Sequence, residues 1–213
     1  MDTSRGCDKQ GLTMKNTLFC LCLLCGSAAA APYYLPTPQP GALTPWDWQP
    51  TWRVDGLYAI GGSHTPDTWG FRTGLELYSN GASQIRHQFS VHAAPQWGDD
   101  HLLRYEDRVE QDLFHLPLTA GYTLNLGITD EIFLFLGGKA GWAFGHYKEH
   151  TAYYRHSTSY NGFTFAAGGG LKVQCSERLY VQAGYDFGRT YTNMHHEDTL
   201  TQHIIYAGLG WRF

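Results

Sequence analysis

Histidine and carboxylate side chains that could bind a metal ion gather in the polar stretches of the chain. His146 and His150 form a His–x3–His spacing, and His195, His196 and Glu197 follow one another directly. Other histidines in such stretches are His64, His101 and His156. Imidazole and carboxylate groups are ligands that zinc accepts, but such spacings become a site only on a rigid frame. We therefore expect solvated loop residues, with no bound metal or cofactor.

Nucleophilic catalysis is a second chemistry to consider. His156, Ser157 and Ser159 lie close together, with Glu149 nearby. A serine nucleophile needs a histidine base and an orienting acid at one place. This group falls in a long polar stretch where nothing obvious holds it in register. We predict no catalytic residues.

Charged residues at alternate positions of otherwise apolar stretches form a third set. They are Arg53, Asp55, Arg72, Glu76, Arg86, Lys139, Lys172, Asp186 and Arg212. Alternate residues of a strand share one face, so these side chains belong to the polar faces of amphipathic strands. Inside a narrow barrel they would form an ion-pair network, because unpaired charges there are very costly. A gated minor pore is the alternative interpretation.

The elements that must position these residues are β-strands. We predict eight, at approximately 52–62, 69–79, 83–94, 105–125, 131–147, 160–175, 178–191 and 200–213. Tight turns are expected at 80–82, 127–130 and 176–177, and longer polar loops at 63–68, 95–104, 148–159 and 192–199. An even strand number, with short turns on one side and long loops on the other, is typical of outer-membrane barrels.

Each long strand has one apolar face and one polar or glycine-rich face. In the stretch 131–147, Leu134, Leu136 and Trp142 alternate with Gly137 and Lys139. A soluble barrel would have no reason to expose glycines to water, whereas a narrow membrane barrel needs room inside for long side chains. Aromatic residues also fall near both ends of the apolar face, as lipid interfaces favour. The pattern therefore favours a polar interior and an apolar lipid face.

The final ten residues, 204–213, continue this alternation to the last position. Leu209, Trp211 and Phe213 share one face, and Tyr206 and Gly208 lie on the other. An aromatic last residue with apolar side chains at every second position before it resembles the C-terminal assembly signal of bacterial outer-membrane β-barrels. We assign that signal to these five residues.

The first 30 residues are predicted to be a leader and signal peptide. Lys15 is followed by a short apolar run, Thr17 to Cys25, and then by small residues up to a cleavage site near Ala30. The run is shorter than the roughly 20 apolar residues of a spanning helix. Translation could instead start at Met14, and the signal peptide could instead be processed with lipidation of Cys25. Residues 31–51 are predicted to be a Pro-rich periplasmic linker and 52–213 the barrel domain.

Charge and cysteine content limit the possible functions. The formal net charge is −4 at pH 7, with no basic stripe of the kind that nucleic acid requires. After removal of the signal peptide Cys175 is the one remaining cysteine, so no internal disulfide is expected.

Residues 52–213 resemble the small OmpA/OmpX-like eight-stranded outer-membrane β-barrel superfamily. The resemblance rests on the strand count, the three tight turns, the segment His115–Tyr122 (HLPLTAGY) and the terminal Tyr206–Phe213 (YAGLGWRF). It implies an all-β, antiparallel, up-and-down transmembrane β-barrel in the outer membrane of a Gram-negative bacterium, exported through a cleaved signal peptide. As partners it implies outer-membrane lipid, lipopolysaccharide and the barrel-assembly machinery, with the protein a monomer.

The superfamily includes structural, adhesive, protective and enzymatic members, so architecture does not decide function. We expect a structural or surface-interaction role (membrane integrity, adhesion or resistance) through four outward loops, for an unidentified ligand. Plausible contact residues are Tyr153, Tyr154, Tyr160 and Tyr191. One alternative is a lipid A-modifying enzyme, although Thr158 stands where a His–x–Ser motif at His156 would need serine. The other is a soluble β-barrel that binds a ligand.

Overall fold

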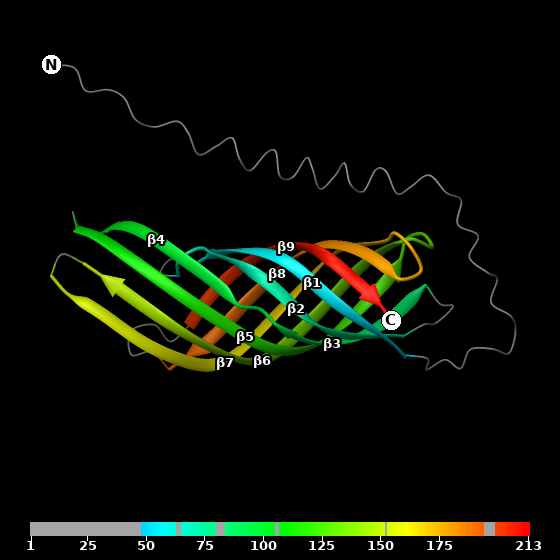
Figure 1. Cartoon of the computed structure of the whole chain (residues 1–213), viewed down its shortest axis with the longest axis horizontal. Helices are drawn as coiled ribbons and strands as arrows, with labels where there is room; N and C mark the ends of the chain where they lie inside the picture. Colours follow the sequence, from blue (N-terminus) through cyan, green and yellow to red (C-terminus); the bar gives the residue numbers. More distant parts are fainter. Residues whose placement is uncertain (1–47, 63–64, 80–83, 105–106, 152, 194–198) are drawn as a thin grey trace, which may run out of the picture. The chain divides into compact units, whose positions relative to one another are not determined.

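The computed structural model describes residues 48–213 except 63–64, 80–83, 105–106, 152 and 194–198 (Figure 1). The predicted signal peptide, most of the predicted linker and the His195–Glu197 cluster lie outside the described residues. The described residues form nine strands: β1 (Trp48–Gly61), β2 (Thr68–Ser79), β3 (Ile85–Ala93), β4 (Gln96–Arg104), β5 (Asp107–Gly127), β6 (Ile132–His150), β7 (Arg155–Gln174), β8 (Leu179–Thr192) and β9 (Thr199–Arg212). No helix in this part of the chain is long and apolar enough to cross a membrane.

The sheet closes into a barrel with eight strand positions. The ring runs β1–β2–β3–β5–β6–β7–β8–β9 and returns to β1, with every pairing antiparallel. The strands wrap around a common axis in Figure 1. Closure removes the free edges that an open sheet would expose to lipid. The eight-stranded up-and-down barrel predicted from the sequence is confirmed.

The ninth strand, β4, shares one barrel position with β3. β3 and β4 pair with β2 in one continuous register. Ala93 of β3 pairs with Thr73 of β2, and Gln96 of β4, three residues after Ala93, pairs with Gly70 of β2. Pro95 interrupts the ladder between them because proline has no N–H to donate. The prediction of a loop at 95–104 was therefore wrong, since most of that segment is a strand paired with β5.

Strands β4 to β7 continue well past the end of the closed ring (Figure 1). The β6–β7 ladder reaches His150 and Arg155, whereas the β7–β8 ladder ends at Gly162 and Thr192. We call the outer parts of these strands the extended sheet: residues 98–104, 107–113, 145–150 and 155–161. Most of residues 148–159 also belong to strands, so the prediction of a loop there was wrong as well. We name this end of the barrel the loop end and the opposite end the turn end.

Side chains alternate between the lumen and the outside, as period-two patterning requires. The face predicted to meet lipid is exposed, with Leu136 and Val91 more than half accessible. Aromatic contacts mark both ends of this apolar belt. Trp69 and Trp97 have ring centroids 5.7 Å apart near the loop end, and Phe89 and Tyr122 lie 5.3 Å apart nearer the turn end.

Candidate functional site: the charged barrel interior

Asp55 of β1 is the centre of the first group of buried charges. Its carboxylate lies 2.7 Å from a guanidinium nitrogen of Arg53 and 2.8 Å from the Nε of Arg72. Arg53 also reaches Glu76 of β2 at 2.9 Å. These side chains are all less than a tenth exposed. Multiple charge-assisted hydrogen bonds offset the cost of removing such groups from water.

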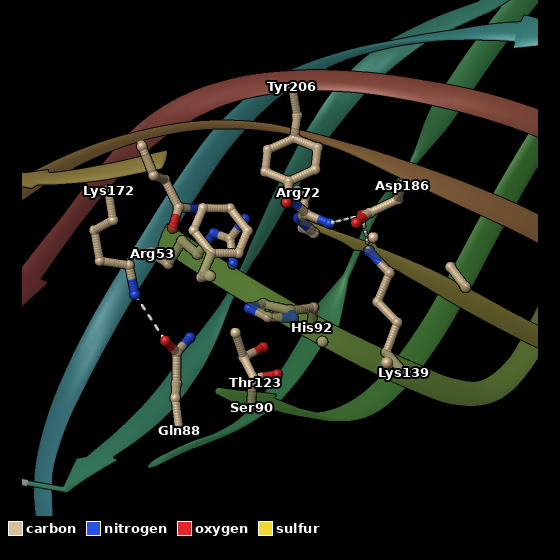
Figure 2. A pocket seen from close by; sticks show the side chains of 16 residues that line it. Arg53, Arg72, Gln88, Ser90, His92, Thr123, Lys139, Lys172, Asp186 and Tyr206 are labelled. Carbon is tan, nitrogen blue, oxygen red and sulfur yellow. Dashed lines mark hydrogen bonds and ion pairs between the residues drawn. The ribbon is translucent and has the colours of Figure 1, made fainter. Parts of the chain in front are cut away.

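Arg72 connects this group to a second carboxylate across the lumen. Asp186 of β8 accepts from Arg72 at 2.9 Å and from the ammonium of Lys139 at 2.6 Å, both drawn in Figure 2. Five ion pairs thus join residues of β1, β2, β6 and β8 into one network. We refer to this set as the paired cluster: Arg53, Asp55, Arg72, Glu76, Lys139 and Asp186.

Neutral polar and aromatic side chains complete the paired cluster. Gln182 donates to Asp55 at 3.0 Å, and the hydroxyl of Tyr180 donates to Glu76. The Arg72 guanidinium lies 4.0 Å from the centroid of the Tyr206 ring, a cation–π geometry (Figure 2). Gln182 and Tyr180 were not predicted as members of the interior network, and Tyr206 was predicted only as part of the assembly signal. Their position on the same strand faces as the charged residues was the available signal.

Glycines opposite the charged residues make room for them. Gly208 pairs with Asp55, and Gly168 pairs with Asp186. A Cβ at either glycine would overlap the carboxylate of its partner. The glycine-rich inner face is therefore a packing requirement of the charged interior, as the sequence argument supposed.

The space left between these side chains is small. A cavity of about 30 Å³ lies among the residues of Figure 2, which include Ser90, His92 and Thr123. A volume of this size holds about one water molecule. A second cavity of about 30 Å³ lies nearer the loop end, beside Gln96 and His115. Side chains fill the lumen around both cavities, so neither is a channel for solutes.

Three of the predicted charged residues stand apart from the paired cluster. Lys172 donates to Gln88 at 2.7 Å and lies 4.8 Å from the Tyr78 ring centroid. The Arg212 guanidinium is 5.4 Å from that same ring, and the Arg86 guanidinium is 4.5 Å from the Phe133 ring. We call Arg86, Lys172 and Arg212 the turn-end cations. The structure thus brings six of the nine predicted residues into one network and places the other three beside aromatic rings.

The loop-end half of the lumen is polar but mostly neutral. Thr68 donates to Gln96 at 2.8 Å, and His115 shares a 2.8 Å hydrogen bond with the hydroxyl of Tyr160. Above them a buried apolar cluster closes the barrel: Leu113, Tyr147, Tyr160 and Leu200. Tyr160, predicted as an exposed contact residue, is 3% exposed and belongs to this cluster. That prediction was wrong because Tyr160 is inward-facing on β7.

The histidine beside Ser157 and Ser159 is not the one expected from the sequence. His146, not His156, lies between the serines: its Nε2 is 3.1 Å from the Ser157 hydroxyl and its Nδ1 is 3.1 Å from that of Ser159. Among the described residues no carboxylate hydrogen-bonds to His146, so an orienting acid is not in place. A groove of about 290 Å³ adjoins His146 and is lined by Trp69, Trp97 and Phe114, among others.

The described histidines do not form a metal centre. His150 lies 3.8 Å from Glu110 across the β5–β6 ladder. No group of three or more potential ligands converges anywhere in the described ranges.

The C-terminal strand has the alternation that the sequence predicted. Leu209, Trp211 and Phe213 are at least half exposed on the outer face, whereas Tyr206 is buried in the lumen. Gly208 faces the lumen opposite Asp55. The closed ring, apolar belt and polar interior together define a transmembrane β-barrel.

The sequence places this barrel in a known family. Residues 18–213 match the model of the outer membrane protein beta-barrel domain, and the chain belongs to that family. A comparison with curated protein sequences gives no match. The protein is therefore a small barrel of the Gram-negative outer membrane.

One solved structure with the same fold is that of Neisserial surface protein A, and two others are reported with it. Neisserial surface protein A is similar with a TM-score of 0.54 and 12% identity, over 77% of this chain and 97% of that chain. The attachment invasion locus protein Ail of Yersinia pestis has a TM-score of 0.47 and 17% identity, over 78% and 97% of the two chains. The N-terminal β-barrel domain of Pseudomonas aeruginosa OprF has a TM-score of 0.44 and 16% identity, over 78% and 100%.

Proposed function

We propose that the barrel is a closed membrane anchor and that the extended sheet is its working part, which contacts molecules outside the cell. The observation that carries this proposal is the projection of β4 to β7 beyond the ring. A purely structural barrel needs no such projection. The role is then a surface interaction, such as adhesion or resistance to external agents, with membrane integrity as the structural contribution of the barrel.

The tip of the extended sheet has the character of a contact surface. Tyr153 is 84% exposed and Tyr154 is 53% exposed. The Thr151 amide donates a 2.9 Å hydrogen bond to the Tyr154 carbonyl, and Glu149 accepts from the Tyr154 hydroxyl at 2.5 Å. Tyrosine on a rigid frame provides contact area at low entropic cost. The filled lumen supports contact, not solute passage, as the function.

The same proposal assigns the orientation. The turn end faces the periplasm and the loop end faces outward, as in barrels with short periplasmic turns and long outer loops. Export would follow cleavage of the signal peptide near Ala30. The assembly machinery would engage β9 through Tyr206, Gly208, Leu209, Trp211 and Phe213, and the monomer would contact lipopolysaccharide through its outer aromatic belt.

A cell-binding assay tests the surface role. Cells that express the wild type or the double variant Tyr153→Ser/Tyr154→Ser are applied to immobilised collagen, laminin and heparan sulfate. Ile128→Ser is the control, because Ile128 is 63% exposed but lies at the turn end. We expect the tip variant to lose at least fivefold in binding to one of these surfaces, with the control unchanged. Heat-modifiable gel migration confirms that each variant is folded.

Two outcomes would contradict the proposal. One is equal binding by the wild type, the tip variant and cells without the protein. The other is cleavage of the extended sheet by protease only in broken cells, because this result would place the sheet in the periplasm. Detergent sensitivity of a deletion strain, together with the first outcome, would leave membrane integrity as the role of the barrel.

A further inference from the structure

The charges inside the barrel do not balance. The described lumen holds six cationic side chains, counting the paired cluster and the turn-end cations, and three carboxylates, Asp55, Glu76 and Asp186. All three carboxylates are in ion pairs with Arg53, Arg72 or Lys139. The turn-end cations are therefore the excess, and they gather at one opening of the barrel.

The two arginines of this group have unused hydrogen-bonding capacity. The Nε of Arg86 and the Nε of Arg212 are buried and have no hydrogen-bond partner in the described part of the chain. Arg212 donates one bond, at 3.3 Å, to the carbonyl of Glu177. No carboxylate of a described residue lies within ion-pair distance of either guanidinium, although Glu131 and Glu177 lie on turns at the same end.

The physical chemistry of this arrangement favours a negative partner. Arginine keeps its charge in proteins, so neither group can be neutralised by losing a proton. Their contacts with the rings of Phe133 and Tyr78 offset only part of the cost of partial burial. A guanidinium group offers paired N–H donors whose geometry matches the oxygens of phosphate or carboxylate. An oxyanion at the opening would supply the missing charge.

We propose that the turn-end opening of the lumen binds a soluble oxyanion of the phosphate class. Arg86 and Arg212 are the direct ligands, each half-buried at the opening, and Lys172 lies deeper and adds positive potential. Both arginines alternate with lipid-facing neighbours, so their side chains face the lumen and are turned away from lipid headgroups. The ligand therefore comes from solution at the turn end, which is the periplasm in the orientation proposed above.

Inorganic phosphate is the probe that tests this site. The protein is folded in non-ionic detergent and titrated with phosphate at constant ionic strength, with ³¹P line width as the readout. We expect saturable binding to the wild type and at least tenfold weaker binding to Arg86→Gln and to Arg212→Gln. The control is Arg178→Gln, because Arg178 is an exposed arginine on the β7–β8 turn at the same end. Its affinity should stay within twofold of wild type.

Further variants separate binding from folding. Arg86→Lys and Arg212→Lys keep the charge but lose the paired donors, so we expect intermediate affinity. Gel migration before and after heating reports whether each variant forms the barrel. Absence of saturable binding to the wild type would overturn the proposal, and so would equal loss of affinity in Arg178→Gln. The surface assay at the extended sheet is independent of this result, because its variants lie at the other end.

Discussion

The barrel wall and the extended sheet share strands, but the polar and apolar faces of these strands are exchanged between the two regions. On β6 the outward residues Trp142 and Phe144 are apolar, and the next two outward residues, His146 and Lys148, are polar. The inward face changes in the other direction, because Lys139 lies in the charged lumen and Tyr147 lies in the apolar cluster. The face that meets lipid in the barrel meets water in the extended sheet.

The neighbouring strands change polarity in the same region of the sheet. In β5 the outward Phe114 is followed, toward the loop end, by Asp112, and in β7 the outward Phe163 is followed by Asn161 and Ser159. The register pairs Phe114 with His146 and Phe144 with Asn161, so the change shifts by two residues from each strand to the next. The three changes therefore form one line across the sheet. We infer that the lipid ends along this line, and the predictions below test it and the interior on either side.

The largest effect is expected from breaking the paired cluster. Asp55→Asn keeps the volume but leaves Arg53 and Arg72 short of one negative charge in the lumen. We expect about 3–5 kcal/mol of lost stability, because removing one partner leaves buried charges uncompensated. Urea unfolding in lipid vesicles measures it. Asp99→Asn, on the exposed outer face of β4, is the control and should change stability little. Equal effects in both variants would show that the interior network contributes no stability of its own.

A pair of arginine substitutions on the outer face of β6 locates the membrane boundary. Ala140→Arg places a charge in the apolar belt, where the expected cost is about 2–4 kcal/mol near the bilayer midplane. His146→Arg places the same side chain beyond the line, where the cost should be about 0–1 kcal/mol. Both residues are on the same strand face, so the introduced arginine points away from the lumen at both positions, although the replaced side chains differ. Unfolding in vesicles checks the difference, and similar costs at both positions would move the boundary.

Period-two patterning was sufficient to predict the barrel and its polar inner face. Partner choice was not predictable in the same way. Asp55 and Arg72 are direct cross-strand neighbours. Arg72 and Asp186 are 114 positions apart in the sequence and meet across the lumen. Such a contact depends on closure of the ring and on the register of every strand between.

The errors at 95–104 and 148–159 have a related cause. Pro95, Gly98 and the acidic pair after it are typical of a loop, and local propensity favours that interpretation. Their strand conformation is imposed by pairing with β5, a long-range contact that the local pattern does not contain. The polarity change on β6 added to the error, because the strand was expected to end where its apolar face ended.

A smaller and local effect is expected inside the extended sheet. Leu113→Ala removes a side chain that packs with Tyr147 and Tyr160. We expect this substitution to lower the stability of the extended sheet by about 2 kcal/mol, the low end of the range for buried leucines, because the site lies beside solvent. We expect faster amide hydrogen exchange in the outer parts of β5 to β7 and no change in the barrel, since weakly packed regions open separately. Faster exchange throughout β6, including residues 132–140, would instead show one cooperative unit.

The smallest effect is expected at the ion pair on the outer face of the extended sheet. Glu110 and His150 are 3.8 Å apart, and each side chain is about half exposed. Water screens such pairs, which contribute roughly 0–1 kcal/mol. Glu110→Gln should therefore leave exchange rates in the extended sheet within about fivefold of wild type, because this is the rate change that corresponds to 1 kcal/mol. A larger increase would mean that Glu110 stabilises the extended sheet by more than this screened ion pair.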